Sequence, residues 1–129
     1  MIKYYTASGL TANVSLSPSG PYAWRLLSIV GYIVTGGTAG TRTVVADLIR
    51  NGLSAVPLHL SPLVSSTLTA GYIAAIGDVA LAGAGGAAAG VQQWSAFPVV
   101  SELDDLEINY SLIAGDLGGY VVALEELIL

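Results

Sequence analysis

The side chains that could perform chemistry are few in this chain, and they are not grouped as catalysis requires. His59 is the only histidine, and a Ser-His-Asp site would need it beside a nucleophile and an orienting acid. No acid lies near it in the sequence, so we interpret His59 as a strand-edge residue that follows Pro57. A zinc site needs three or four good ligands, and a chain with one histidine and no cysteine does not supply them.

Four acids lie close together in the C-terminal part: Glu102, Asp104, Asp105 and Glu107. Such a cluster could bind Ca²⁺ or supply the paired carboxylates of a glycosidase. In an extended strand, however, Asp104 points away from Asp105 and Glu107, because successive side chains alternate between faces. Residues 103–110 alternate in this way, with Leu106, Ile108 and Tyr110 inward. We therefore expect a solvated strand face, and a protein that is not an enzyme and uses no metal or cofactor.

A glycine pattern in the middle of the chain resembles a dinucleotide fingerprint only superficially. GAGGAA at residues 83–88 matches G-x-G-x-x-A, but it lies inside the Ala/Gly tract of residues 81–91. A dinucleotide site needs that pattern between a strand and a helix of a βαβ unit. The rest of the chain has too few helix-forming segments to complete such a unit. We therefore expect the tract to form a long loop or a short helix.

The composition points to surfaces that are covered by protein. The 129 residues are 53% hydrophobic and 10% charged, with a mean hydropathy of +0.70. A folded monomer of this mass has roughly 6,400 Å² of surface. The surface area per charged side chain is then about 500 Å², against about 200 Å² in an ordinary domain. A neutral surface coated with Ser and Thr is one explanation. Contact with other subunits is the one we favour, because large apolar patches mark interfaces.

Membranes and nucleic acids fit the sequence poorly. Residues 51–77 and 79–101 carry no Asp, Glu, Lys or Arg, yet Pro57, Pro62 and the lack of flanking basic clusters disfavour transmembrane segments. All four cations lie in residues 1–50 and eight of the nine acids lie after them. The net charge of −5 disfavours binding to phosphates, which requires clustered Lys and Arg.

The pattern of apolar residues and turns predicts an all-β protein. Val, Ile, Thr, Tyr and Trp dominate, and Gly, Pro, Ser or Asn interrupt them at short intervals. We expect one antiparallel β-sandwich domain over residues 1–129, jelly-roll-like, with about eight strands and with residues 1–20 as a candidate N-terminal arm. The segment 22–35 predicts one long strand bent near Gly31.

The segment TRTVVADLIRNG at residues 41–52 predicts a strand that runs into a tight turn. Val44, Ala46 and Leu48 fall on one side, and the other side holds Thr43, Val45, Asp47 and Ile49. Asn51-Gly52 is a strong hairpin signal. Because both faces of this strand are apolar, we expect one to pack in the core and the other to meet a second chain.

Two stretches, residues 24–52 and 113–126, resemble small structural proteins of tailed-phage virions. WRLLSIVGYIVTGGTAGTRTVVADLIRNG is similar to their hydrophobic strand, Gly/Thr loop, Arg-containing strand and Gly turn, and AGDLGGYVVALEE is similar to their closing strand. The resemblance implies a capsid decoration (cement) protein or head fibre with a jelly-roll-like fold. It implies a homo-oligomer, with a trimer expected, that binds the major capsid protein or other virion proteins on the outer surface of the capsid.

Seven residues are the candidate interface positions: Tyr22, Trp24, Tyr32, Arg42, Arg50, Trp94 and Phe97. The aromatic residues are candidates for core or interface anchors, since large aromatics dominate binding energy. Arg42 and Arg50 are candidates for pairing with the C-terminal acids, in the same or a neighbouring copy. The alternative function is a knob of a fibre or tail that binds a host glycan through exposed Tyr and Trp.

Overall fold

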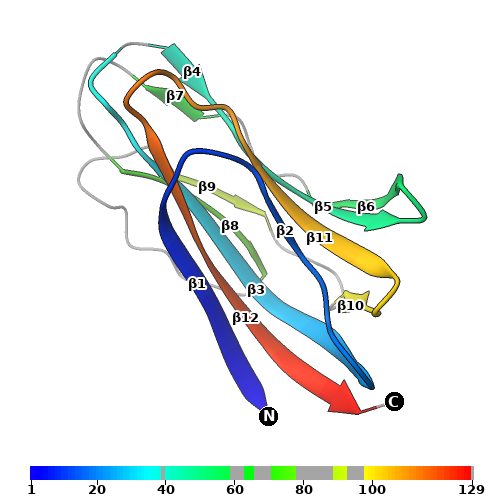
Figure 1. Cartoon of the computed structure of the whole chain (residues 1–129). Helices are drawn as coiled ribbons and strands as arrows, with labels where there is room; N and C mark the ends of the chain where they lie inside the picture. Colours follow the sequence, from blue (N-terminus) through cyan, green and yellow to red (C-terminus); the bar gives the residue numbers. More distant parts are fainter. Residues whose placement is uncertain (39, 59–62, 66–70, 78–88, 93–97, 129) are drawn as a thin grey trace.

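The fold consists of strands throughout the part of the chain that can be described. A computed structural model describes residues 1–38, 40–58, 63–65, 71–77, 89–92 and 98–128, and these residues contain no helix. The strands are β1 (Ile2–Leu10), β2 (Val14–Leu16), β3 (Tyr22–Val34), β4 (Gly40–Arg42), β5 (Val44–Arg50), β6 (Leu53–Leu58), β7 (Leu63–Ser65), β8 (Gly71–Gly77), β9 (Ala89–Gln92), β10 (Val99–Val100), β11 (Asp104–Tyr110) and β12 (Leu117–Ile128) (Figure 1). The all-β fold predicted from the sequence is confirmed.

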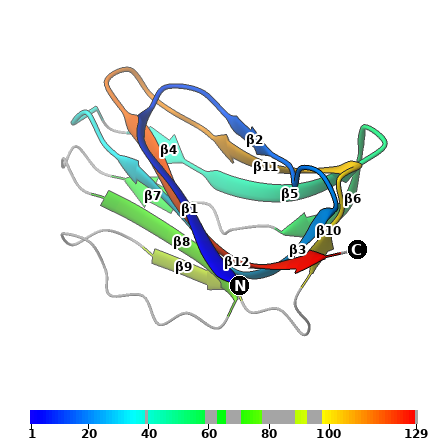
Figure 2. The ribbon, with the colours of Figure 1, turned by 60° about the horizontal axis from the view of Figure 1, so that its bottom comes forward.

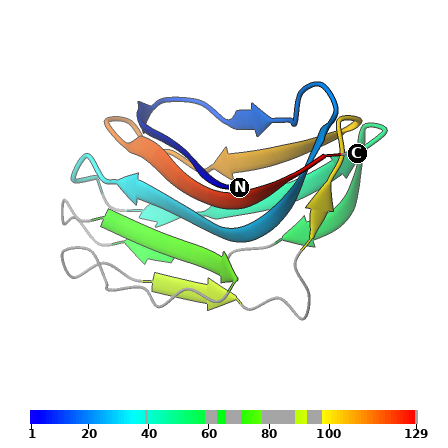
Figure 3. The ribbon, with the colours of Figure 1, turned by 90° about the horizontal axis from the view of Figure 1, so that it is seen from below.

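Two sheets form the layers of a sandwich, as Figure 2 shows. Sheet A has the order β1-β12-β3-β8-β9, with β10 added beside β3, and sheet B has the order β2-β11-β5-β6. The short strands β4 and β7 pair separately. All pairings are antiparallel except that of β8 with β9. Figure 3 shows β12, β3, β8 and β9 side by side.

Eight of these strands have the order of a jelly roll. These eight strands form the orders β1-β12-β3-β8 and β2-β11-β5-β6. Along the chain, each strand of this set is followed by one in the other sheet, except that β6 follows β5 within the same sheet. Two interleaved Greek keys of eight strands define this architecture. The jelly-roll-like sandwich expected from the sequence is therefore the observed topology.

The hairpin between β5 and β6 forms where the sequence predicts it. Asn51 and Gly52 both have positive φ, 54° and 75°, which is the conformation that a type I′ turn requires. Along β5, Val44, Ala46 and Leu48 are buried, whereas the residues between them are half-buried. The sequence left open which side of this strand packs in the core, and the structure shows that it is the side of Val44, Ala46 and Leu48.

One hydrophobic core fills the space between the sheets. Its buried members come from both layers: Trp24, Leu26, Ile29, Ile33, Val44, Ala46, Leu48, Val100, Leu106, Ile108, Tyr120, Val122 and Leu124. Trp24 also packs against Tyr5, with ring centroids 5.3 Å apart. Alternate residues of β12 and β3 enter this core, so the residues between them must face outward.

Two expectations about the N-terminal half need correction. Residues 1–20 do not extend as an arm, because β1 pairs with β12 in sheet A and β2 pairs with β11 in sheet B. The irregularity in β3 does not lie at Gly31, which keeps regular partners on both sides. It lies at Leu27, which has no residue of β12 opposite it: Ala123 lies opposite Ser28, and Leu124 lies opposite Leu26.

Several sequence expectations lie outside the described residues. They concern His59, residues 81–88 of the Ala/Gly tract, Trp94 and Phe97. Within the described ranges, no helix is long and apolar enough to cross a membrane.

Candidate interaction faces

The outward side of β1, β12 and β3 forms an apolar surface, here called the A face. Its members alternate with core residues along each strand: Ile2, Tyr4, Thr6, Arg25, Ser28, Val30, Tyr32, Val34, Leu117, Gly119, Val121, Ala123 and Glu125. Tyr4 is 68% exposed and Ile2 is 56% exposed. A sheet face that meets only water normally alternates to polar residues, and this face departs from that pattern.

Register places these residues in rows across the three strands. Tyr4 lies beside Ala123, which lies beside Ser28, and the next row contains Thr6, Val121 and Val30. Cross-strand neighbours in one row have Cβ atoms about 5 Å apart. The rows therefore make a continuous surface rather than scattered apolar spots.

The A face carries no net charge. Its only charged side chains are Arg25 and Glu125, which are cross-strand partners at one end of the face and form an ion pair with Nη1 and Oε1 3.4 Å apart. Both side chains are more than one third exposed, and an exposed pair of this kind contributes little to stability. A neutral face approaches another neutral surface without electrostatic penalty.

Tyr32 lies on the A face, over a glycine of the neighbouring strand. A Cβ atom on Gly119 would come within 2.1 Å of Cζ of Tyr32. On the inner side of the same strand, the ring of Tyr110 lies against Gly118, and its hydroxyl donates to the carbonyl of Gly119 at 2.8 Å. Burial raises the pKa of Tyr110 well above its usual range. The Gly118-Gly119 pair thus lets an aromatic ring pack on each side of β12.

The outward side of sheet B, here called the B face, is acidic. It carries Asp47 on β5 and Asp105 and Glu107 on β11, as the alternation of residues 103–110 predicts. Asp47 and Glu107 are direct cross-strand partners, an arrangement that is destabilising for like charges. Among the described residues, no group of three His, Cys, Asp or Glu side chains could hold a metal ion.

All four cations of the chain are engaged within it. Lys3 pairs with Glu126 at 2.7 Å, Arg25 with Glu125, Arg42 with Asp116, and Arg50 with Asp104. The pairing of Arg42 and Arg50 with C-terminal acids, expected in the same or a neighbouring copy, occurs in the same copy. The acids of the described residues that have no cation are those of the B face and Glu102, and none of them is a member of the A face.

A fully buried ion pair joins two loops at one end of the sandwich. The guanidinium of Arg42 binds Asp116 through Nε and Nη2, at 2.6 and 3.0 Å, and Nη2 also donates to the carbonyl of Thr38. The carboxylate of Asp116 accepts hydrogen bonds from the amides of Gly36 and Ile113 as well. Burial opposes ionisation of Asp116, but these donors outweigh it and lower its pKa. The role of this cluster is to fix the loops after β3 and after β11.

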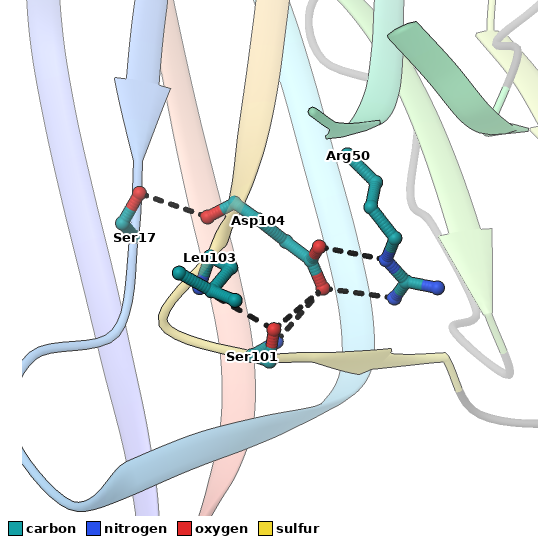
Figure 4. A network of polar contacts seen from close by, with 5 residues as sticks. All are labelled: Ser17, Arg50, Ser101, Leu103 and Asp104. Carbon is teal, nitrogen blue, oxygen red and sulfur yellow. Dashed lines mark hydrogen bonds and ion pairs between the residues drawn. The ribbon is translucent and has the colours of Figure 1, made fainter. Parts of the chain in front are cut away.

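A second polar network closes the opposite end of β5, as Figure 4 shows. Nε and Nη2 of Arg50 bind the two carboxylate oxygens of Asp104 at 2.8 and 2.9 Å. The amide and hydroxyl of Ser101 donate to Asp104, and the hydroxyl of Ser17 donates to its carbonyl and to the carboxylate of Asp105. The hydrogen bond from Arg50 is the main cause that lowers the pKa of Asp104 to about 2. This network holds β2, β5 and β11 together.

The sequence-derived candidates occupy different places in this arrangement. Tyr32 lies on the A face, Trp24 lies in the core, and Tyr22 is half-buried at the start of β3. Arg42 is completely buried, whereas the side chain of Arg50 is 52% exposed. Trp94 and Phe97 lie outside the described residues.

Sequence reasoning missed the contribution of β1 to the exposed surface. Ile2 and Tyr4 are exposed large residues on one side of an edge strand. Their spacing, with Lys3 and Tyr5 between them, is the period of a strand and could have identified a second apolar face. Deciding which side faces outward requires the register with β12.

Searches with this chain find no matching protein-family model, no matching curated protein and no matching solved structure. Any statement about function therefore rests on the fold, the two faces and the residues that build them.

Proposed function

We propose that this chain is a non-enzymatic structural protein of a phage virion, a capsid decoration protein that binds the outer capsid lattice and stabilises it. The observation that carries the proposal is the contrast between the neutral, apolar A face and the acidic B face. A decoration protein needs one surface for neighbouring protein and another for solvent. The A face is the surface for the capsid or for sister chains, and the B face is the surface for solvent.

The fold supports this proposal by analogy. Jelly rolls occur in viral capsid proteins, in lectins and in cupins, and a fold alone does not define a function. The polar side chains support it more directly, because the buried or bidentate arginine pairs tie elements of the chain together and leave no cation for a ligand in the described residues. The homotrimer implied by the resemblance stays a prediction; the strand pairing inferred below predicts a dimer or an even multiple instead, and the mass in solution decides between the two.

The test compares two matched valines on the two faces. Val30 on β3 and Val45 on β5 are both half-buried, one on the A face and one on the B face. Capsid shells assembled from the accompanying major capsid protein are mixed with the wild type, Val30→Glu or Val45→Glu, and co-sedimentation is measured. We expect Val30→Glu to weaken binding at least tenfold and Val45→Glu to bind as the wild type does. Wild-type chain that stays in the supernatant overturns the proposal.

A glycan-binding knob of a fibre or tail is the second candidate. It is favoured by Tyr4, whose ring is 68% exposed, and by the presence of Tyr32 on the same face. Aromatic side chains with a polar end are common at exposed binding surfaces. A glycan array separates the two functions, because a decoration protein binds shells and no sugar.

A further inference from the structure

Strand β1 is an edge strand of sheet A, and among the described residues its pairing is with β12 alone. The amide of Glu126 donates to the carbonyl of Met1 at 3.0 Å, and Ile2 lies opposite Glu125. In an antiparallel ladder, hydrogen-bonded and non-hydrogen-bonded pairs alternate. The odd-numbered residues of β1 therefore bond to β12, and the even-numbered residues Ile2, Tyr4 and Thr6 direct their N–H and C=O groups away from the sheet.

This edge lacks the features that normally prevent strand pairing. Natural edges are protected by prolines, bulges, charges or short length. β1 has nine residues and no proline, and its register with β12 is regular from Ile2 to Ala7. Its one charge, Lys3, is held by Glu126 within the chain. The regular run is long enough to accept a second strand.

We infer that two copies of this chain associate through β1, in an antiparallel pair about a two-fold axis that passes beside Tyr4. In this register Tyr4 lies opposite Tyr4 of the second copy, and Ile2 lies opposite Thr6. The pair makes about six main-chain hydrogen bonds between the even-numbered residues. It joins the two A sheets into one continuous sheet.

The alternative registers are less favourable for identifiable reasons. Pairing Ile2 with Tyr4 places Lys3 opposite Lys3 of the second copy, and like charges directly opposite each other are destabilising. Pairing Ile2 with Ser8 extends past Ala7, where the register becomes irregular and Gly9 has a φ of +67°. In the register centred on Tyr4, Lys3 lies opposite Tyr5, so no like charges meet.

A second copy fits this edge because a two-fold axis brings together the same groups that are free on each copy. The contact between the two β1 strands contains no acid that lacks an ion-pair partner. Among the described residues, such acids lie on the B face or in the turn at Glu102. Two neutral A faces then become one larger apolar surface. The inference goes beyond the proposed function, because it concerns the free chain and requires no capsid.

The chain contains no cysteine, so single cysteines can report the register directly. Directly opposite residues of a hydrogen-bonded pair have Cα atoms about 5.5 Å apart, within the range of a disulfide. We expect Tyr4→Cys to form a covalent dimer under mild oxidation. Thr6→Cys is the matched control on the same strand and face, and its two copies would lie too far apart to cross-link. Equal cross-linking of both variants overturns the register.

Two further measurements test the pairing without relying on Tyr4→Cys. Sedimentation of the wild type at 100 μM, about the concentration at which weak association is detected, should give a dimer or an even multiple. A monomer or a strict trimer under these conditions overturns the inference. The double variant Ile2→Cys/Thr6→Cys should cross-link twice, which non-reducing mass spectrometry detects. A monomer that still co-sediments with shells would refute this pairing and leave the proposed function standing.

Discussion

Asp116 is the carboxylate on which the buried end of the sandwich depends. Its oxygens accept from Arg42 and from the amides of Gly36 and Ile113, and neither side chain of the ion pair is exposed. Removing one partner of such a pair leaves an uncompensated buried charge. The cluster is therefore more sensitive to mutation than its net contribution to stability would suggest.

We expect Asp116→Asn to lower the free energy of unfolding by about 3–5 kcal/mol, because it removes the negative charge that Nε and Nη2 of the buried Arg42 bind. Urea denaturation followed by tryptophan fluorescence measures this change. Glu125→Gln is the control, since it removes an acid from an exposed pair with Arg25, and its effect should stay below about 1 kcal/mol. Equal effects of the two variants would contradict the argument from burial.

Asp104 should make stability depend on acid. Its pKa of about 2 in the folded chain lies below the ordinary 3.8, chiefly because of the hydrogen bond from Arg50. The stabilisation is therefore complete above about pH 4 and is lost as the pH falls through 2, on the order of 1 to 2 kcal/mol. The free energy of unfolding, measured between pH 5 and 2 (about the range of carboxylate titration), should fall less steeply in Asp104→Asn. Parallel curves for the two proteins would refute this assignment.

At the scale of the element, β12 depends on two adjacent glycines. The ring of Tyr32 occupies the space that a side chain at position 119 would need. Glycine in a strand otherwise weakens it, because it adds conformational entropy to the unfolded chain. The glycine is retained here by the close approach of the ring.

We expect Gly119→Ala to destabilise the protein by about 1–2 kcal/mol, because the ring of Tyr32 must leave its place on the A face. In a Tyr32→Ser background the same substitution should become neutral or stabilising, since alanine is the better strand residue where space allows. Thermal unfolding of the four proteins completes this double-mutant cycle. An equal effect of Gly119→Ala in both backgrounds would show that the ring is not the cause.

Local features of the elements could be predicted from the sequence, and their exact partners could not. Asn51-Gly52 specifies its turn through backbone conformation alone, whereas the alternation of β5 does not say which of its two sides enters the core. The sequence predicts that Arg42 pairs with a C-terminal acid, but Asp116 is 74 positions away, and nothing in the local pattern distinguishes it from the other acids after residue 50. The segment 22–35 is apolar on both sides, so its alternation does not reveal which residues enter the core. The A face becomes visible only when the register joins β1, β12 and β3.

For the whole molecule, the two faces predict one orientation in an assembly. The A face is neutral and apolar, and the B face holds Asp47, Asp105 and Glu107. A negatively charged outward surface keeps particles apart in solution. The strand 41–52, apolar on both sides in the sequence, places its outward Val45 and Ile49 among these acids, whereas the members of the A face include no acid without a cation.

Cysteine labelling checks this orientation. Ser28 lies on the A face and Ser15 lies on the B face, and the chain has no other thiol. In particles that carry the chain, we expect Ser15→Cys to react with a maleimide as fast as in the free protein and Ser28→Cys to react at least tenfold more slowly. Protection of Ser15→Cys alone would reverse the orientation.

The position of β12 in sheet A has a consequence for the order of events during synthesis. β12 lies between β1 and β3 and pairs with both along most of its length, although β1 ends at Leu10 and β12 begins only at Leu117. During synthesis β1 therefore lacks this neighbour until the residues of β12 have been made. Contacts between such distant segments form slowly, so we expect β1 to stay open to pairing with other polypeptides until β12 folds beside it.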